Sequence, residues 1–557
     1  MRKQTSKHTL CAWLIGAALT TLLMLALHRL GALRYENSDE MLMVKAFMGF
    51  EGGVPADYTL YTHTLAAYAL RLLASLRADV PWFSVCQLAL LWLSGVVIGK
   101  SLLQLSWRSG RGALPGLAAA ALCAIVFEAF AMCRITYTTT AALAGAASVA
   151  QWMSLNFDRR GARIGGMLLC LLLLVCGYCL RVTAVLPSAA FLGLAAALRF
   201  VENKRQRIPV LVFALAALCL FGALTGIRSA EIQRRGLADE VAWQEARINL
   251  MDYTDFQTNL QPALDADTGL SEEEIALVQQ WYFMDGNITT EALQAMANAY
   301  TPTESPWTQL LSFLHTYSRQ ALALLLVLAL GLLDVCSQPR WGAWAAALAL
   351  LGTAAQMILL SLQGRVIPRA VDSVLMPCGA LLCALFVRRG KMGVFPARQL
   401  IAGALASICI VLAGVHGWQT FSQLRKTPDS VSQQREDELE AYALAHPEQL
   451  IVRSCDLLRD TRLWPDVSAG IPGNLMIWGD WICHTPSWDA QLSRFGFDAQ
   501  TFSAEDWLSD SILFAAMEEA DAQPLLRHLE NALACRISLS EAAQSGTVRL
   551  YRFARAE

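Results

Sequence analysis

Four consecutive polar residues near the N-terminus are the first candidates for chemistry. Asn37-Ser38-Asp39-Glu40 follows an apolar run and precedes an amphipathic stretch. A carboxylate in the first turn of a helix is held ionised by the helix dipole, and an ionised Asp39 could act as a general base toward a hydroxyl group. Acidic residues are also preferred at any helix start, and on spacing alone this plainer interpretation is the more common one.

Two arginines in a short loop form a second candidate group. Arg365 and Arg369 lie four residues apart in Gln363-Gly-Arg-Val-Ile-Pro-Arg, between two apolar runs. Two guanidinium groups at this spacing could form bidentate hydrogen bonds to a phosphate. The alternative is that both side chains extend to the membrane interface as ordinary anchors.

Three further charged residues, Glu128, Arg134 and Arg181, stand at or inside the ends of apolar runs. Charges within membrane spans are costly and usually face a partner or a cavity. These three residues could pair with one another, or line an outward cavity beside Asp39. His63, in Tyr61-Thr-His-Thr, begins another helical stretch, where a single histidine is more often structural than a ligand.

The composition indicates a membrane protein that positions these residues. The chain has 557 residues, of which 55% are hydrophobic and 16% charged, whereas soluble domains carry roughly a quarter charged residues. Eleven runs are long enough to span a bilayer. They lie near 10–30, 81–105, 114–133, 136–156, 164–181, 182–200, 208–227, 317–335, 341–362, 371–387 and 399–418. We divide the stretch 164–200 at Arg181 into a helical hairpin.

The distribution of basic residues predicts the orientation. With the N-terminus in the cytoplasm, every basic cluster between spans falls on the cytoplasmic side, as the positive-inside rule requires. These clusters are Arg108 and Arg111; Arg159, Arg160 and Arg163; Lys204, Arg205 and Arg207; Arg340; and Arg388, Arg389 and Lys391. The C-terminus and the polar segments 31–80, 228–316 and 419–557 are then extracytoplasmic.

The polar segments have predicted elements of their own. The first contains helices at 39–50 and 62–76 that could lie in the membrane interface, and Ser271 caps a helix in the second. In the third we expect helices at 436–446, 504–518 and 522–534, and strands at 450–453, 475–478, 536–539 and 548–553. The sequence therefore divides into a membrane core, 1–418, and a small α/β domain, 419–557, whose Cys455, Cys483 and Cys535 give no definite disulfide pairing.

The layout resembles the GT-C class of polytopic membrane glycosyltransferases, which use polyprenyl-phosphate-linked sugars. The resemblance rests on about eleven spans, on Ser38-Asp39-Glu40 in the first outer loop, on Tyr61-Thr-His-Thr-Leu opening its second helix, and on the C-terminal domain. The stretches beginning at Arg134 and 269–285 are also similar to poorly characterised bacterial membrane proteins of this type. The WWDYG-type motif of oligosaccharyltransferases is absent.

The resemblance implies that Asp39 is the base and that Glu40 assists it or binds a metal. It also implies that Arg365 or Arg369 contacts the lipid phosphate, and a cluster of Asp39, Glu40 and Glu128 could bind a divalent cation. The expected partners are a polyprenyl-phosphate sugar donor and an envelope glycan, lipid or protein acceptor, without nucleic acid. The rival hypotheses are a transporter or flippase for a lipid-linked glycan, and a non-catalytic membrane scaffold or sensor.

Overall fold

The computed structural model describes residues 2–50, 53–300, 305–388, 396–424, 430–457 and 460–556. By its internal contacts the chain divides into two units. Unit 1 comprises Met1–Glu36, Val85–Ile227 and Glu304–Thr427, and unit 2 comprises Asn37–Ser84, Arg228–Thr303 and Pro428–Glu557. The outer loops therefore group with the C-terminal segment, which differs from the division at residue 418 that we expected from the sequence.

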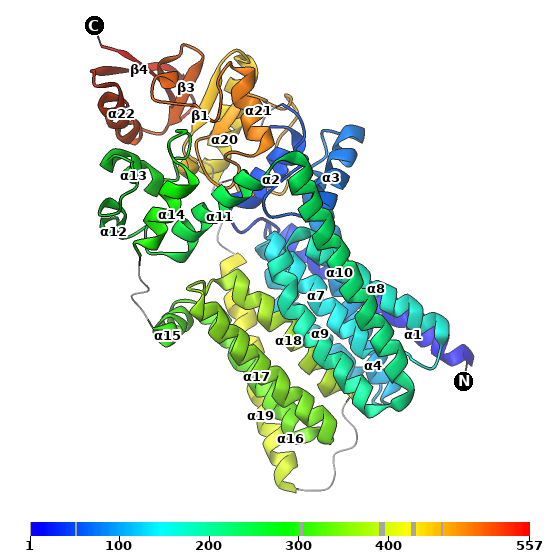
Figure 1. Ribbon diagram of the computed structural model, residues 1–557. Coiled ribbons are helices and arrows are strands. Elements are labelled where there is room, and N and C mark those ends of the chain that lie inside the picture. The colour runs from blue at the N-terminus through cyan, green and yellow to red at the C-terminus, as the bar shows by residue number, and fades with distance from the viewer. Residues whose placement is uncertain are drawn as a thin grey trace. The chain divides into compact units, whose positions relative to one another are not determined.

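Unit 1 is a bundle of long apolar helices (Figure 1). It contains α1 (Arg2–Arg29), most of α4 (Trp82–Arg108), α5 (Leu114–Cys123) with the π-helical turn η1 (Ala124–Glu128) and α6 (Ala129–Cys133), α7 (Tyr137–Met153), α8 (Arg160–Leu180), α9 (Val182–Glu202) and most of α10 (Arg207–Arg235). After α15 (Pro306–Thr316) come α16 (Ser318–Ser337), α17 (Arg340–Leu362), α18 (Pro368–Arg388) and α19 (Pro396–Leu424). A short 3-10 turn, Lys204–Gln206, precedes α10.

Every apolar run predicted to span the membrane is helical. Within the described residues, nine helices are long and apolar enough to cross a bilayer. The other two are α7, which has 17 residues, and α19, whose apolar part covers Ala404–Gln419. The predicted hairpin is confirmed, because Arg181 separates α8 from α9 in an extended conformation. Of the predicted basic clusters, Arg389 and Lys391 lie outside the described residues.

Small residues explain how the centre of the bundle packs. All residues of α7 are buried, and many are Ala, Gly, Ser or Thr, which let membrane helices approach closely. α7 packs against α8, α9 and α18. A Cβ atom on Gly145 would lie 2.0 Å from the Ser188 hydroxyl of α9, so only glycine fits there.

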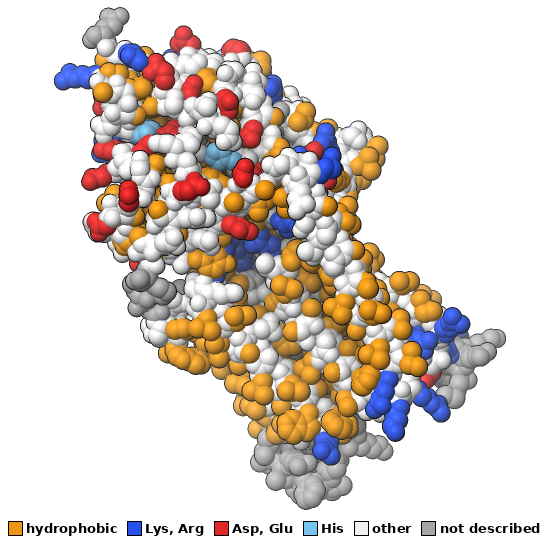
Figure 2. All heavy atoms as spheres, viewed as in Figure 1, with side chains coloured by type: hydrophobic (Ala, Val, Ile, Leu, Met, Phe, Trp, Pro, Cys, Tyr) orange, Lys and Arg blue, Asp and Glu red, His pale blue; other side chains and the backbone are white. Residues whose placement is uncertain are grey.

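The outer surface of the bundle is apolar. Figure 2 shows hydrophobic side chains covering it, among them the exposed Leu211, Leu218, Trp344, Leu351 and Ile410. Exposing such a continuous apolar surface to water is unfavourable, and surfaces of this kind are typical of lipid-facing helices. Together with the helix lengths, it identifies the chain as a multi-pass membrane protein.

Unit 2 contains two helices from the first outer loop, α2 (Ser38–Met48) and α3 (Thr64–Leu76). The predicted end of α2 at residue 50 is wrong by two residues, because Gly49 adopts φ 93° and terminates the helix. Residues Glu40–Met48 are all buried, so α2 is an internal helix. α3 has an exposed apolar face at Leu65, Leu72 and Leu76, which suits the membrane interface.

The second outer loop is helical. It contains α11 (Ala238–Tyr253), α12 (Gln261–Leu264), α13 (Glu272–Gln279) and α14 (Thr290–Asn298). The predicted cap of α13 is confirmed: Ser271 and Glu274 form a reciprocal capping box.

The C-terminal segment forms the expected small α/β fold. Its helices are α20 (Ser430–Ala445), α21 (Pro486–Arg494) and α22 (Glu519–Leu533), and its strands are β1 (Leu450–Arg453), β2 (Leu475–Ile477), β3 (Ile512–Ala516), β4 (Ile537–Ser545) and β5 (Val548–Arg555). Two 3-10 turns, Cys455–Leu457 and Asp506–Leu508, complete it. The strand order is β2-β1-β3-β5-β4, with β1 parallel to β2 and β3, and β5 antiparallel to β3 and β4.

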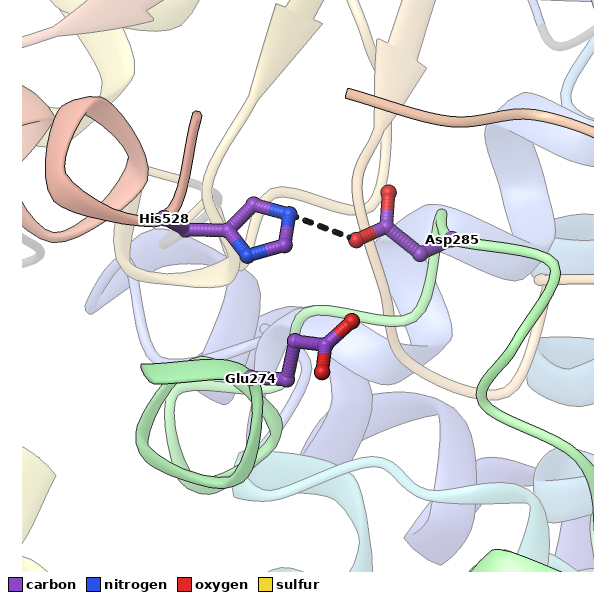
Figure 3. Close-up of side chains that lie close together, drawn as sticks. All are labelled: Glu274, Asp285 and His528. Atoms are coloured by element: carbon purple, nitrogen blue, oxygen red, sulfur yellow. Dashed lines mark ion pairs between the residues drawn. The ribbon is translucent and has the colours of Figure 1, made fainter. Parts of the chain in front are cut away.

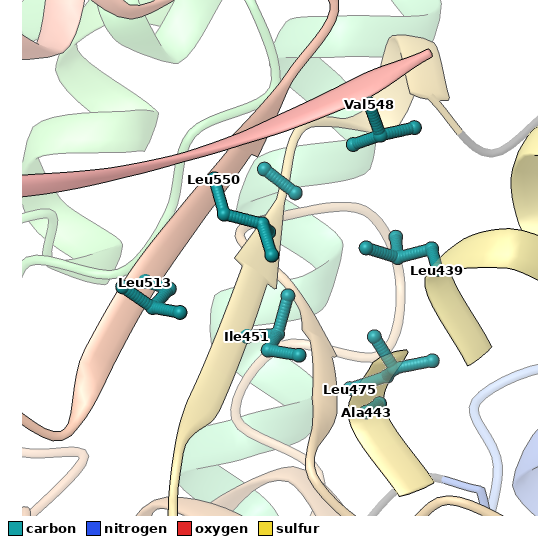
Figure 4. Packing of buried hydrophobic residues seen from close by; sticks show 8 residues of the cluster. Leu439, Ala443, Ile451, Leu475, Leu513, Val548 and Leu550 are labelled. Atoms are coloured by element: carbon teal, nitrogen blue, oxygen red, sulfur yellow. The ribbon is translucent and has the colours of Figure 1, made fainter. Parts of the chain in front are cut away.

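One predicted element of this segment is wrong. The helix expected at 504–518 is instead a 3-10 turn followed by β3, which lies between β1 and β5. A central strand is covered on both faces and consists of a continuous apolar run, here Ile512-Leu-Phe-Ala-Ala with all five residues buried. Ile451, Leu475, Leu513 and Leu550 of the sheet pack against Leu439 and Ala443 of α20 (Figure 4).

Candidate functional site

The candidate site in unit 2 contains two aspartates, Asp39 and Asp480, that are far apart in the sequence. Asp39 stands in the first turn of α2. Asp480 follows β2 by three residues and is half-buried, and its φ of 69° is strained for a residue with a side chain. Burial, and next the negative charge of Asp39, raise the pKa of Asp480 to about 7. A carboxyl group with this pKa exchanges protons at neutral pH, as a general acid or base must.

The loop that carries Asp480 is held by helix α11. The Gln244 amide donates hydrogen bonds to the carbonyl oxygens of Trp481 and Cys483, at 3.0 and 2.8 Å. Arg247, one helical turn later, is buried and donates to Gln244 Oε1 at 2.9 Å. Its charge opposes the rise in the pKa of Asp480. The site therefore places one buried guanidinium near the carboxyl group of Asp480.

Close backbone packing fixes the same loop. A Cβ atom on Gly479 would lie 1.4 Å from the carbonyl oxygen of Trp281, so this position requires glycine. Trp281, Asp480 and His484 all have positive φ angles. Strained non-glycine residues cost about 1–3 kcal/mol each and gather at functional sites. This local strain is a second reason to regard the Asp480 loop as functional.

Helix α2 is anchored by a buried ion-pair network. Lys45, six residues after Asp39, contacts both Glu436 and Glu440 of α20, and Arg453 of β1 also contacts Glu436. All four side chains are at most 5% exposed. Burial would depress the pKa of Lys45, but the two glutamates raise it above its ordinary value. The network ties α2 to the sheet and fixes the start of the helix.

The other candidate residues of the first outer loop have structural roles. Glu40 is fully buried next to Asp39. His63 is the N-cap of α3, and its Nδ1 accepts a hydrogen bond from the backbone N–H of Leu65 at 3.1 Å. A histidine in this role is structural. Nearby, the hydroxyl of Tyr61 accepts a long hydrogen bond, 3.4 Å, from Arg247.

A cavity lies at the carboxyl edge of the parallel strands of unit 2. It has a volume of about 640 Å³ and is lined by Ser454 after β1, Trp478 after β2, Met517 and Glu518 after β3, and Arg435 of α20. The carboxyl ends of parallel strands are where α/β folds usually bind ligands. Asp480 stands in the same loop as Trp478.

Unit 1 contains a separate basic site. Arg134 and Arg319 line a polar cavity of about 100 Å³ together with Ser318, Gln320 and Pro368. Arg319 forms a buried ion pair with Asp372, and Arg134 lies 3.4 Å from Glu36. Burial raises the pKa of Glu36, whereas the nearby charges of Arg134, Arg369 and Arg319 lower it. Three arginines therefore gather around two carboxylates.

Backbone pairing positions this basic site. Tyr35 pairs with Ile135 as an isolated parallel bridge, and Ile135 donates its N–H to the carbonyl oxygen of Arg34 at 2.9 Å. The pairing brings Glu36, from the segment after α1, beside Arg134, from the connection between α6 and α7. Arg369 is in the first turn of α18.

The other sequence candidates in unit 1 are not part of this cavity's lining. Glu128 ends the π-helical turn and is buried in the bundle, where its Oε2 would lie 2.8 Å from a Cβ atom on Gly95. Arg181 lies over the ring of Tyr137 at 5.3 Å and donates to Thr183 at 3.1 Å. Arg365 precedes α18 in the loop between α17 and α18.

The best metal-binding geometry in the described residues differs from the expected one. Glu274, Asp285 and His528 offer ligand atoms within 4.8 Å of one another. The predicted combination of Asp39, Glu40 and Glu128 is not among the groups with such geometry in this part of the chain. Of the three cysteines in the C-terminal segment, Cys483 is buried, and Cys455 and Cys535 are half-buried.

Comparison with solved structures gives matches over almost the whole chain. The chain is similar to ArnT from Cupriavidus metallidurans bound to undecaprenyl phosphate, with 13% identity, a TM-score of 0.40 and 97% of each chain covered. It also matches an oligosaccharyltransferase from Archaeoglobus fulgidus in the apo form, with 12% identity and a TM-score of 0.40, covering 96% of this chain and 69% of the other.

No protein-family model matches the chain. No curated protein matches it either.

Proposed function

We propose that the protein is a membrane glycosyltransferase that moves a sugar from a polyprenyl-phosphate donor to a hydroxyl group of an envelope glycan, lipid or protein. The observation that carries the proposal is the pair Asp39 and Asp480, with the pKa of Asp480 near 7. A half-buried carboxylate pair with the buried Arg247 near Asp480, in a chain with apolar spanning helices, suits proton transfer from an acceptor hydroxyl during attack on a lipid-linked donor.

In this mechanism the pair holds one proton at neutral pH, because two neighbouring carboxylates resist double ionisation. The ionised member, which we assign to Asp39, removes the proton from the acceptor hydroxyl. The acceptor oxygen then bonds to the anomeric carbon as the bond from that carbon to the phosphate oxygen breaks. The polyprenyl phosphate leaves with the bonding electrons, and the proton passes from Asp39 to water.

The arginines of unit 1 support a phosphate-bearing donor. Arg134, Arg319 and Arg369 all lie near Glu36, so this side of unit 1 concentrates positive charge. Guanidinium groups bind phosphate oxygens through paired hydrogen bonds. We assign Arg134, which is 41% exposed, as the residue that meets the phosphate, and Arg319 and Arg369 as its neighbours.

The acceptor has a candidate site of suitable size. The cavity of about 640 Å³ at the carboxyl ends of β1 and β3 lies within the roughly 300–1,000 Å³ typical of small-molecule sites. Its polar residues and its position next to the Asp480 loop suit a sugar-sized acceptor. We place the active side outside the cytoplasm, following the distribution of basic residues in the sequence.

The test is turnover by the purified full chain in lipid nanodiscs. A panel of undecaprenyl-phosphate-linked sugars serves as donors, and the release of undecaprenyl phosphate is measured. We expect release with at least one donor, and a loss of about 10²–10⁴-fold in Asp39→Asn. Asp489→Asn is the matched control, because burial raises the pKa of Asp489 to about 6 without a contribution from Asp39. Donor binding without turnover in the wild type would favour lipid transport.

A further inference from the structure

Three buried side chains in unit 2 form a compact group that the proposed function does not use. Glu274 comes from α13, Asp285 from the loop before α14, and His528 from α22 (Figure 3). They are 8%, 4% and 2% exposed. His528 Nε2 lies 2.7 Å from Asp285 Oδ2, and Figure 3 shows the carboxylate of Glu274 pointing toward the same space.

The charges of this group do not balance. A protonated His528 would neutralise only one of the two carboxylates. The group borders a cavity of about 510 Å³ whose lining contains no lysine or arginine within the described part of the chain. The one other acid of the lining, Glu505, is already paired with Arg555. Buried negative charge is stable only when it is paired or binds a metal ion.

The imidazole of His528 is placed so that its Nε2 atom could bind a metal ion. His528 Nε2 faces Asp285 Oδ2 at a poor angle for a hydrogen bond, so their contact is mainly electrostatic when the imidazole is protonated. A short approach between a ring nitrogen and a carboxylate oxygen, poorly aligned for a hydrogen bond, is what two ligands of one ion would show. This observation is independent of the charge imbalance.

Neighbouring groups orient the two carboxylates. The Tyr282 hydroxyl donates to Asp285 Oδ1 at 2.6 Å. The Asn287 amide donates to Glu274 Oε1, and the backbone N–H of Ser271 donates to Glu274 Oε2 at 2.7 Å. Each carboxylate oxygen still has a second lone pair. Hydrogen bonds that fix the ligands in this way are characteristic of metal sites.

We propose that Glu274, Asp285 and His528 bind a divalent transition-metal ion that joins the second outer loop to helix α22. A donor set of two carboxylates and one imidazole suits Mn²⁺ or Zn²⁺, with water completing the coordination. The site is a structural clamp: it connects residues more than 240 positions apart in the sequence, and it is independent of the glycosyl-transfer chemistry.

The test uses the purified full chain and Mn²⁺ as the probe, because carboxylate and imidazole ligands suit Mn²⁺ better than the chain's many thiols do. Bound Mn²⁺ is measured by electron paramagnetic resonance, and the melting temperature is recorded with Mn²⁺ and with EDTA. We expect one bound ion per chain and a higher melting temperature with Mn²⁺, reversed by EDTA. A repeat with Zn²⁺ tests the other metal of the class.

Two substitutions and two controls complete the experiment. His528→Gln and Asp285→Asn should weaken Mn²⁺ binding at least about tenfold, the lower range for losses at metal sites. Glu272→Gln, an exposed acid in the same helical turn as Glu274, and His446→Gln, another histidine of unit 2, should leave it unchanged. Wild-type protein that binds neither metal overturns the proposal, whether or not the variants fold. The proposal is also overturned if both ligand variants still bind the metal as the wild type does. In that case Glu274 is only part of a capping box, and His528 and Asp285 are only a His–Asp pair.

Discussion

Substituting Asp480 by asparagine should separate stability from activity. In the folded chain the pKa of Asp480 is raised to about 7 from its ordinary 3.8. The folded state therefore holds the proton more tightly than the unfolded state does. The stability of the wild-type protein must then fall as pH rises from about 4 to about 7, and it stays lower at higher pH.

The size of this effect follows from the shift. About three pKa units at about 1.36 kcal/mol each correspond to at most about 4 kcal/mol at pH 8. Part of this is shared with Asp39, since the two groups titrate together. An asparagine side chain is neutral at every pH, so Asp480→Asn should melt several degrees higher than the wild type at pH 8 and nearly equally at pH 4.

The assay is thermal unfolding of the detergent-solubilised chain between pH 4 and pH 8, with turnover measured on the same samples. The variant should gain stability at pH 8 and keep most of its activity, because asparagine imitates the protonated form of Asp480 and leaves Asp39 as the ionised base. Its turnover should also depend less on pH between about 6 and about 8 than that of the wild type. Asp489→Asn should gain stability as well, because burial raises the pKa of Asp489 to about 6, and its turnover should keep the pH dependence of the wild type. A melting temperature that is independent of pH in the wild type, or an Asp480→Asn variant that is less stable at pH 8, would refute the reasoning.

Three other predictions test neighbouring parts of the structure. Glu40→Gln should reduce turnover less than Asp39→Asn, because a residue one step along a helix points about 100° away; comparison of kcat for the two variants decides this. Arg134→Gln should raise the KM for the donor with little change in melting temperature, and Arg134→Lys should bring the KM only part of the way back to the wild-type value. The control Arg340→Gln, at an exposed arginine, should have the KM of the wild type. Equal KM values for all of these variants would exclude Arg134 as a phosphate ligand. Lys45→Met leaves Glu440 without its ion-pair partner, and should cost about 3–5 kcal/mol of unfolding free energy, measured by denaturant titration; a smaller loss would show that the network does not anchor α2.

The sequence predicts the membrane part of the fold well, because hydrophobic length and basic residues are local signals. The hairpin at Arg181 is an example: the apolar stretch is too long for one helix, and the structure breaks it at that residue. The C-terminal segment is harder to predict. Its strand β3 resembles a helix in the sequence because a short apolar run does not reveal by itself whether its neighbours are strands or turns.

The candidate site shows a different limit. Asp39 is identified from its place in the first turn of a helix, which is a local pattern. Its neighbour Asp480 is over 400 residues away, and its importance comes from partial burial and from the positive φ at that position. The stretch Trp478-Gly-Asp-Trp marks Asp480 as a candidate in the sequence, but it gives no sign that Asp39 is its neighbour. Arg319 is likewise not recognisable as a site residue in the sequence, because it opens an apolar helix and its ion-pair partner Asp372 belongs to another helix.

The central claim is that Asp39 transfers a proton during sugar transfer from a polyprenyl phosphate. The most direct measurement is single-turnover release of undecaprenyl phosphate by the wild type and by Asp39→Asn, with the donor prebound to both. We predict equal donor occupancy and a loss of about 10²–10⁴-fold in the rate for the variant. Equal rates for the two proteins would contradict the claim, and would leave the carboxylate as the start of helix α2 only.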